Sequence, residues 1–116
     1  MMLAPAGMMN SSSIPWNILS SSVTVGIQTE GWNLADAGPE PDAVRSFTVP
    51  IAFVSPFALP PVMHLSLTGL DADQRDSTRV SLTTREITAS GFEAVVSTWA
   101  GTRLYGVEFN WLAIGA

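Results

Sequence analysis

Six short runs in which apolar and polar residues alternate constrain this chain more than any other feature of its 116 residues. They recur at roughly even spacing between Ser22 and Gly115, separated by stretches rich in Gly, Pro, Asp and Ser. Strict alternation is typical of half-buried strands, whereas an amphipathic helix repeats its apolar residues every three or four positions. The pattern predicts an all-β fold, a six-stranded antiparallel β-sandwich with a short irregular N-terminal arm.

The expected strands have the sequences SVTVGIQT, VRSFTVPIAFV, VMHLSLTGL, TRVSLTTREIT, FEAVVSTW and RLYGVEFNWLAIG. Their inward parity carries, in chain order, Val23, Val25, Ile27, Phe47, Val49, Ile51, Phe53, Met63, Leu65, Leu67, Val80, Leu82, Val107, Phe109, Trp111 and Ala113. Tyr105 does not fit, because strict alternation would bury it in the row that contains Val107. Gly106 is the kind of residue that marks a β-bulge or a bend, so the sequence leaves the direction of Tyr105 open.

The composition restricts the classes of function. The chain has no cysteine, which removes disulfides, thiolate chemistry and cysteine zinc sites. Its net charge of -5, with only five basic residues, argues against nucleic acid, because phosphates require clustered Lys and Arg. Charged residues make up 13% of the chain, against a usual share of about 25%. So little surface charge predicts large buried interfaces between copies, and we expect an oligomer.

Residues 1–22 are expected to form an N-terminal arm, and residues 23–116 the sandwich domain. The opening MMLAPAGMMN is apolar but has no positively charged start, and Pro5 interrupts it, so we predict neither a signal peptide nor a membrane span. Prolines likewise divide the apolar run 49–67 into strand, turn and strand. Two interpretations of the arm stay open: a leader that lies on the domain, and a peptide that docks on another protein.

Patterns for catalysis and metal binding are incomplete. His64, the single histidine, lies on the polar parity of its strand with no nucleophile partner. We interpret it as a surface or interface residue; if it lies between copies of an oligomer, its titration would make association depend on pH. The sequence DADQRD, residues 71–76, begins like a calcium loop but lacks the Gly and Glu of an EF-hand. Glu93 and Glu108, the candidate glycosidase pair, are expected on adjacent strands facing solvent. We therefore expect no enzyme activity, no metal and no cofactor.

Four other residues have the chemistry of a small polyol site. Trp99 and Tyr105 flank a predicted turn, and an aromatic ring can stack on the apolar face of a sugar while its polar tip stays wet. Arg79 lies on the outward parity of its strand and Asp42 in a long loop. A guanidinium and a carboxylate supply charge-assisted hydrogen bonds to neighbouring hydroxyls. Such residues near strand ends are also compatible with ordinary packing.

An ordered series of motifs continues over most of the domain: GW at 31–32, RSFTVPIAFVSPFALPPVMHLSLTGLD at 45–71, TRV at 78–80, GF at 91–92, TW at 98–99 and LYGVEFNWLAI at 104–114. The block F-x-S-P-F-x-x-P-P-V, followed by SLTGLD, is the most specific part. With these motifs the chain resembles an H-type lectin domain, the family of snail agglutinins and of the C-terminal domain of slime-mould discoidins. The resemblance covers roughly three-quarters of the chain.

The resemblance implies a homotrimer with a shallow site for galactose-type sugars, often N-acetylgalactosamine, near the boundary between protomers. The family's site residues fall on Asp42, Arg79, Trp99 and Tyr105, with Asp42 expected from a neighbouring copy. Two departures bear on specificity. Ala100 stands where the snail agglutinins have a histidine, and Glu40 where the best-known member has a glycine.

These observations predict a trimeric lectin domain that mediates attachment to cell-surface glycans. The alternative is a structural or receptor-binding tip of a fibre or phage-tail-like particle, attached through residues 1–22. A chain that starts with methionines and has no evident export signal favours assembly into a released particle over secretion alone, and leaves the localisation undetermined. The two functions are compatible, because a fibre tip must recognise something.

Overall fold

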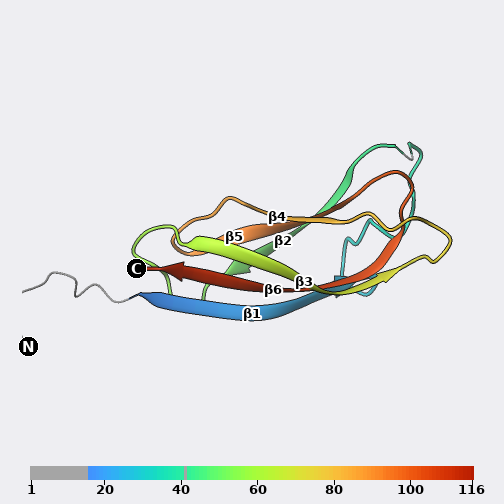
Figure 1. Cartoon of the computed structure of the whole chain (residues 1–116). Coiled ribbons are helices and arrows are strands. Elements are labelled where there is room, and N and C mark those ends of the chain that lie inside the picture. The colour runs from blue at the N-terminus through green and yellow to red at the C-terminus, as the bar shows by residue number, and fades with distance from the viewer. Residues whose placement is uncertain (1–15, 41) are drawn as a thin grey trace, which may run out of the picture.

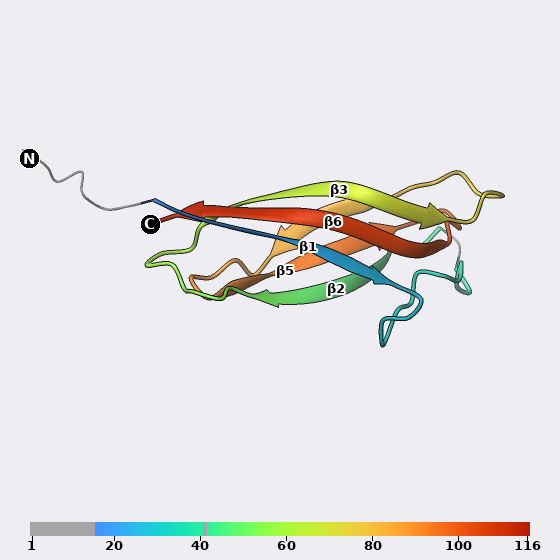
Figure 2. The same ribbon diagram turned by 90° about the horizontal axis from the view of Figure 1, so that it is seen from below.

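The computed structural model describes residues 16–40 and 42–116, which form two three-stranded antiparallel sheets with no helix among them. The strands are β1 (Asn17–Gly26), β2 (Arg45–Ala52), β3 (Val62–Ala72), β4 (Ser81–Arg85), β5 (Gly91–Thr98) and β6 (Leu104–Gly115). One sheet has the order β1-β6-β3 and the other β2-β5-β4, and the two lie face to face (Figures 1 and 2). The predicted antiparallel β-sandwich is confirmed.

The core lies between the two central strands, β5 and β6. On β6 the predicted inward row is confirmed, because every second side chain from Val107 to Ala113 is buried. β5 instead has the consecutive buried residues Ala94, Val95 and Val96. Val95 has the opposite parity to Ala94 and Val96 and pairs with Thr48 of β2 and Thr83 of β4, so the strand has apolar residues on both faces and its alternation is weak.

β1 begins earlier in the chain than the sequence pattern indicates. Residues 17–22, which the sequence analysis placed in the arm, pair in register with β6 from Gly115 to Asn110. The serine triplet at 20–22 hides the alternation there, because all three residues are polar and exposed. At the other end, Ile27 was expected inward but is 63% exposed, since β1 stops at Gly26. The remainder of the arm, residues 1–15, is outside the described residues.

Two β-bulges shift the pairing of β3 with β6. Leu67 pairs with Phe109 and Gly69 with Glu108, so one extra residue, Thr68, is inserted on β3. Leu67 lies opposite the buried Phe109, on the face predicted for it, but it is 43% exposed on the edge strand β3. A β-bulge of this kind bends the strand that contains it.

The second bulge lies on β6 and settles the direction of Tyr105. Asp71 pairs with Gly106 and Ala72 with Leu104, so Tyr105 is the extra residue. Leu104 and Val107 are both buried, whereas Tyr105 is half-buried. The bulge that Gly106 allowed has therefore taken Tyr105 out of the core row.

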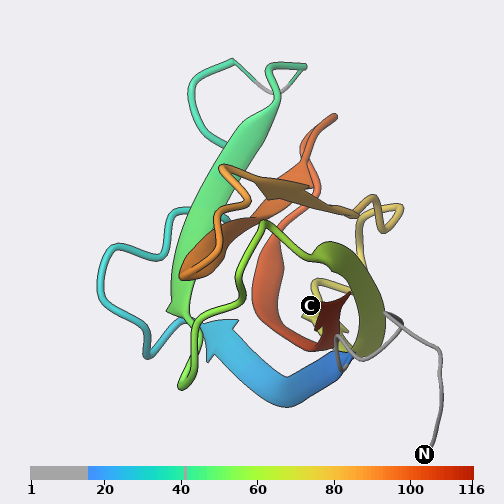
Figure 3. The same cartoon turned by 90° about the vertical axis from the view of Figure 1, so that its left-hand side faces the viewer.

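The two ends of the sandwich contain different segments of the chain. The segments 27–44, 73–80 and 99–103 gather at one end, on the right of Figure 1. The described chain starts, and the C-terminus lies, at the opposite end, which faces the viewer in Figure 3. The start of β1 and the three loop segments are thus separated by the length of the strands.

Gly26 is required by the bulge at Tyr105. A Cβ atom at position 26 would lie 2.4 Å from the backbone oxygen of Tyr105, whereas at Gly106, its pairing partner, the nearest atom would be 3.7 Å away. Gly26→Ala should therefore lower the free energy of unfolding by roughly 1–3 kcal/mol, the usual cost of overpacking. Gly106→Ala, the matched control, should change it little. Urea denaturation measures both, and equal effects would contradict this role of Gly26.

Candidate functional site

The four residues predicted to form the site all lie at the loop end of the sandwich. Asp42 is in the segment after β1, Arg79 in the segment after β3, and Trp99 directly follows β5. Tyr105 is the second residue of β6. Asp42 is exposed and the other three are half-buried, so each of them has surface that a ligand could reach.

A tight turn places Trp99 at the tip of the β5–β6 connection. Ala100 and Gly101 both have positive φ, at 56° and 80°, and the amide of Thr102 donates to the Trp99 carbonyl over 3.2 Å. Two consecutive left-handed residues define a two-residue turn of the kind that joins twisted antiparallel strands. Gly101 adopts this conformation freely, whereas Ala100 is strained in it. Position 100, where the snail agglutinins have histidine, is thus a strained and exposed turn residue.

Hydrogen bonds connect Arg79 to residues on both sides of this turn. The Thr98 hydroxyl donates to the Arg79 carbonyl over 2.5 Å. The Arg79 Nη1 donates to the Ser77 carbonyl at 3.3 Å and lies 3.5 Å from the Thr102 hydroxyl, which itself donates to Ser77 at 2.6 Å. Within the described residues, Nε and Nη2 of Arg79 have no protein partner. The structure therefore brings Arg79 to the Trp99 turn with donors left for a ligand.

Tyr105 belongs to a second cluster, formed with the segment after β3. Its hydroxyl donates to Asp73 Oδ2 over 2.7 Å. The same carboxylate accepts from Arg75 through Nε at 2.9 Å, Nη2 at 2.7 Å and the backbone amide at 2.9 Å. The neighbouring pair Arg103 and Asp76 is joined at 2.8 and 3.1 Å.

These contacts shift the acidity of the cluster. Hydrogen bonds from Arg75, then from Tyr105, hold the pKa of the Asp73 carboxyl far below its usual value, and Arg103 lowers the pKa of Asp76 in the same way. The Asp73 carboxylate in turn raises the pKa of the Tyr105 phenol, because it stabilises the protonated donor.

Asp42 is not joined to the other three residues within one chain. No hydrogen bond or ion pair among residues 16–40 and 42–116 links it to Arg79, Trp99 or Tyr105. Arg45, which sequence reasoning missed, contributes to holding its loop. Arg45 Nη1 donates to the Asp36 carbonyl and Nη2 to the Thr102 carbonyl at 2.5 Å. This side chain ties the Asp42 loop to the Trp99 turn.

The residues considered for other chemistry have different roles. Asp73 and Asp76 of the calcium-like sequence each face an arginine, so their charge is already balanced. Glu93 pairs with Arg85 at 2.9 Å. The expectation that Glu93 and Glu108 lie on adjacent strands is wrong, because β5 and β6 belong to different sheets. His64 is exposed on β3, opposite Leu112 of β6.

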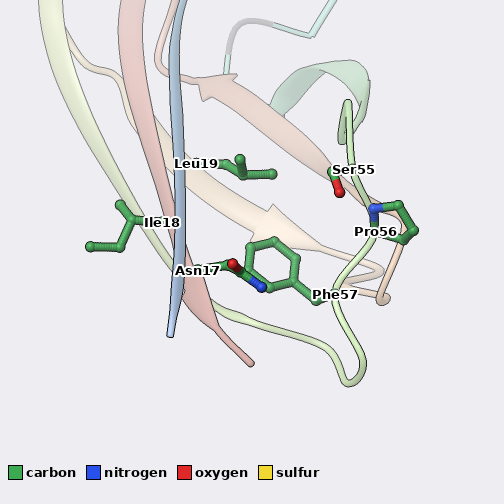
Figure 4. Close-up of a pocket in the computed structure, with 6 residues that line it drawn as sticks. All are labelled: Asn17, Ile18, Leu19, Ser55, Pro56 and Phe57. Atoms are coloured by element: carbon green, nitrogen blue, oxygen red, sulfur yellow. The ribbon is translucent and has the colours of Figure 1, made fainter. Parts of the chain in front are cut away.

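Two of the cavities lined by described residues differ in shape and position. A small one of about 160 Å³ lies at the end opposite the four residues, where Asn17 and Leu19 of β1 point toward Phe57 and the Ser55–Pro56 segment (Figure 4). None of its lining residues ionises. A more open depression of about 310 Å³ lies between Tyr105 and residues 24–29. No helix in the described chain is long and apolar enough to cross a membrane.

Comparison with known proteins settles the family. The model of the H-type lectin domain matches residues 48–114, which is more than half of the chain. The chain belongs to the H-type lectin domain family. The resemblance seen in the sequence motifs is thereby confirmed, and the predicted lectin class of domain with it.

Two relatives illustrate how far the sequence likeness of this lectin domain extends. It is 33% identical over 72 residues to "ATP synthase subunits region ORF 7" of Fuscovulum blasticum, a match covering 62% of this chain and 63% of that protein. It is 31% identical over 70 residues to a discoidin-1 protein of Dictyostelium discoideum, covering 60% of this chain and 28% of the discoidin. The lectin domain thus spans well under two thirds of the discoidin and slightly under two thirds of the first relative.

A solved structure shares the fold. The recombinant discoidin II of Dictyostelium discoideum superposes with a TM-score of 0.73 over 90% of this chain and 39% of that chain, at 19% sequence identity. At this identity the likeness concerns the fold, and it supports the two-sheet arrangement described above.

The Asp73 cluster makes stability depend on pH in a defined direction. Because the pKa of Asp73 is lower in the folded state than its usual value of 3.8, its contribution is fully present above about pH 4 and is lost as the pH falls further. Between about pH 5 and about pH 3 the urea midpoint of the wild type should therefore fall more steeply than that of Asp73→Asn. Parallel slopes for the two proteins would contradict the assignment.

Proposed function

We propose that this H-type lectin domain binds glycans that display galactose- or N-acetylgalactosamine-type sugars, without catalysis, and that it does so as a homotrimer. The observation that carries the proposal is the gathering of Arg79, Trp99 and Tyr105 at one end of a domain of this family. Each is partly accessible there, and Arg79 keeps guanidinium donors that its protein partners do not use.

The chemistry of these groups suits a sugar better than a charged metabolite. The Arg79 guanidinium donates to two neighbouring hydroxyl oxygens, and the Trp99 and Tyr105 rings provide surface for the apolar face of the sugar. Asp42 accepts from a hydroxyl of the ligand. Because Asp42 is exposed and no contact joins it to Arg79 in the described chain, we assign it to the site of a neighbouring copy.

The shallowness of the proposed site bears on the need for several copies, and two neighbouring positions bear on its specificity. A shallow site with few polar groups binds one sugar weakly, and several sites on one oligomer raise the strength of attachment to a glycan surface. Ala100 removes the side chain that histidine provides in the snail agglutinins, and Glu40 adds an anion two residues before Asp42. Both changes bear on the acetamido group, so galactose itself is the first sugar to test.

A second function is favoured by the placement of the two ends. β1 begins at the end of the sandwich opposite the segments 73–80 and 99–103, which contain Arg79 and Trp99 (Figure 1). A domain attached through residues N-terminal to Trp16 would present its sugar site outward. We propose that the domain serves as the receptor-binding tip of a fibre or particle, which is compatible with glycan binding.

Removal of the Arg79 side chain tests the sugar site. Arg79→Ala should weaken galactose binding by about 10- to 100-fold, the loss expected for a hydrogen bond from a charged donor. Arg85→Ala is the matched control, because Arg85 is paired with Glu93 on β5 and Thr48 on β2. Calorimetry or a glycan array measures both. Binding that survives Arg79→Ala unchanged, or an absence of binding by the wild type, would refute the assignment.

Removal of residues 1–15 tests attachment. The deletion must stop before Asn17, because residues 17–22 are part of β1. The shortened protein should bind sugar as the full chain does and should no longer co-purify with the assembly that contains it. Retention in that assembly would exclude the arm as the attachment segment, whereas loss of sugar binding would show that the arm supports the site.

A further inference from the structure

Tyr105 has left the core, and nothing in its own strand fixes the direction of its ring. As the inserted residue of the bulge, it lies between two buried residues, Leu104 and Val107, without a place in the inward row. A half-buried aromatic side chain in such a position keeps rotamer freedom unless another group holds it. A binding surface made from this ring therefore needs a second group that fixes it.

Asp73 supplies that group. Its carboxylate accepts the Tyr105 hydroxyl at 2.7 Å, and it is itself immobilised. Arg75 donates to both of its oxygens, the Asp73 amide donates to the Arg103 carbonyl at 3.0 Å, and the residue is only 8% exposed. The contact spans 32 positions of sequence and joins the segment after β3 to the start of β6.

We infer that Asp73 is a positioning residue of the sugar site: it holds the Tyr105 ring at the orientation in which the ring meets the ligand. The inference rests on the proposed glycan-binding function. Because the Tyr105 proton is committed to Asp73, Tyr105 offers a ligand its ring and an acceptor oxygen but no donor. A sugar hydroxyl that meets this oxygen must therefore donate to it.

A depression in the surface lies beside Tyr105. Tyr105 forms one wall of the depression of about 310 Å³, and residues 24–29 form the other. Loss of the tether to Asp73 would free the ring to leave this rotamer. Asp73 thus acts on affinity through Tyr105 and makes no contact with the sugar itself.

A double-mutant cycle separates this role from simple support of the loop. Asp73→Asn and Tyr105→Phe should each weaken galactose binding by about tenfold, the equivalent of one net hydrogen bond. The double variant should be no weaker than either single variant, because both remove one interaction. Asp76→Asn, the matched control, removes a carboxylate of the same segment that bonds Arg103 and not Tyr105, and it should leave affinity within about twofold.

A spectroscopic measurement accompanies the cycle, since Tyr105 is the single tyrosine of the chain. Its phenol should ionise above the usual pKa of 10.0 in the wild type and closer to it in Asp73→Asn, but not in Asp76→Asn. Additive losses of affinity, or an effect of Asp76→Asn equal to that of Asp73→Asn, would overturn the inference while sugar binding stands. A wild type that binds no sugar would instead refute the proposed function, and the positioning role with it.

Discussion

Burial of the inner face of β6 is the constraint on which the rest of the domain depends. This strand is central in its sheet, pairs with β1 on one side and β3 on the other, and contributes a continuous buried row from Val107 to Ala113. The bulge at Tyr105 interrupts this row, and Leu104 on its far side is buried again. Tyr105 therefore leaves the core row within the same strand that builds the core, and it lies in the proposed sugar site.

Side-chain hydrogen bonds to backbone carbonyls help to hold the loops beyond the strands, together with apolar contacts such as those of the buried Leu34 and of Trp32. Arg45 reaches two carbonyls on separate loops, and the hydroxyls of Thr98 and Thr102 donate to carbonyls of the Arg79 segment. Asp73 holds Tyr105 through a hydrogen bond between their side chains. These hydrogen bonds fix the relative positions of the loop segments at this end.

The sequence predicts the sandwich because alternation survives wherever one face of a strand meets solvent. The prediction fails where a strand lacks this contrast between a buried apolar face and an exposed polar face. The serines hide the first half of β1, and the run Ala94–Val96 is buried without alternating. The bulge at Tyr105 could be anticipated from Gly106, but the partner that receives its hydroxyl could not. Asp73 lies 32 residues away and looks like an ordinary turn aspartate, so only the folded chain reveals the contact.

Chemical-shift mapping of the labelled protein with galactose tests the central claim most directly, because it locates the ligand without a mutation. The account predicts that the perturbed amides cluster at the loop end, around Arg79, the Trp99 turn and Tyr105, with Asp42 among them in the oligomer. Perturbations confined to the opposite end, around Asn17 and Phe57, or scattered over both sheets, would contradict it.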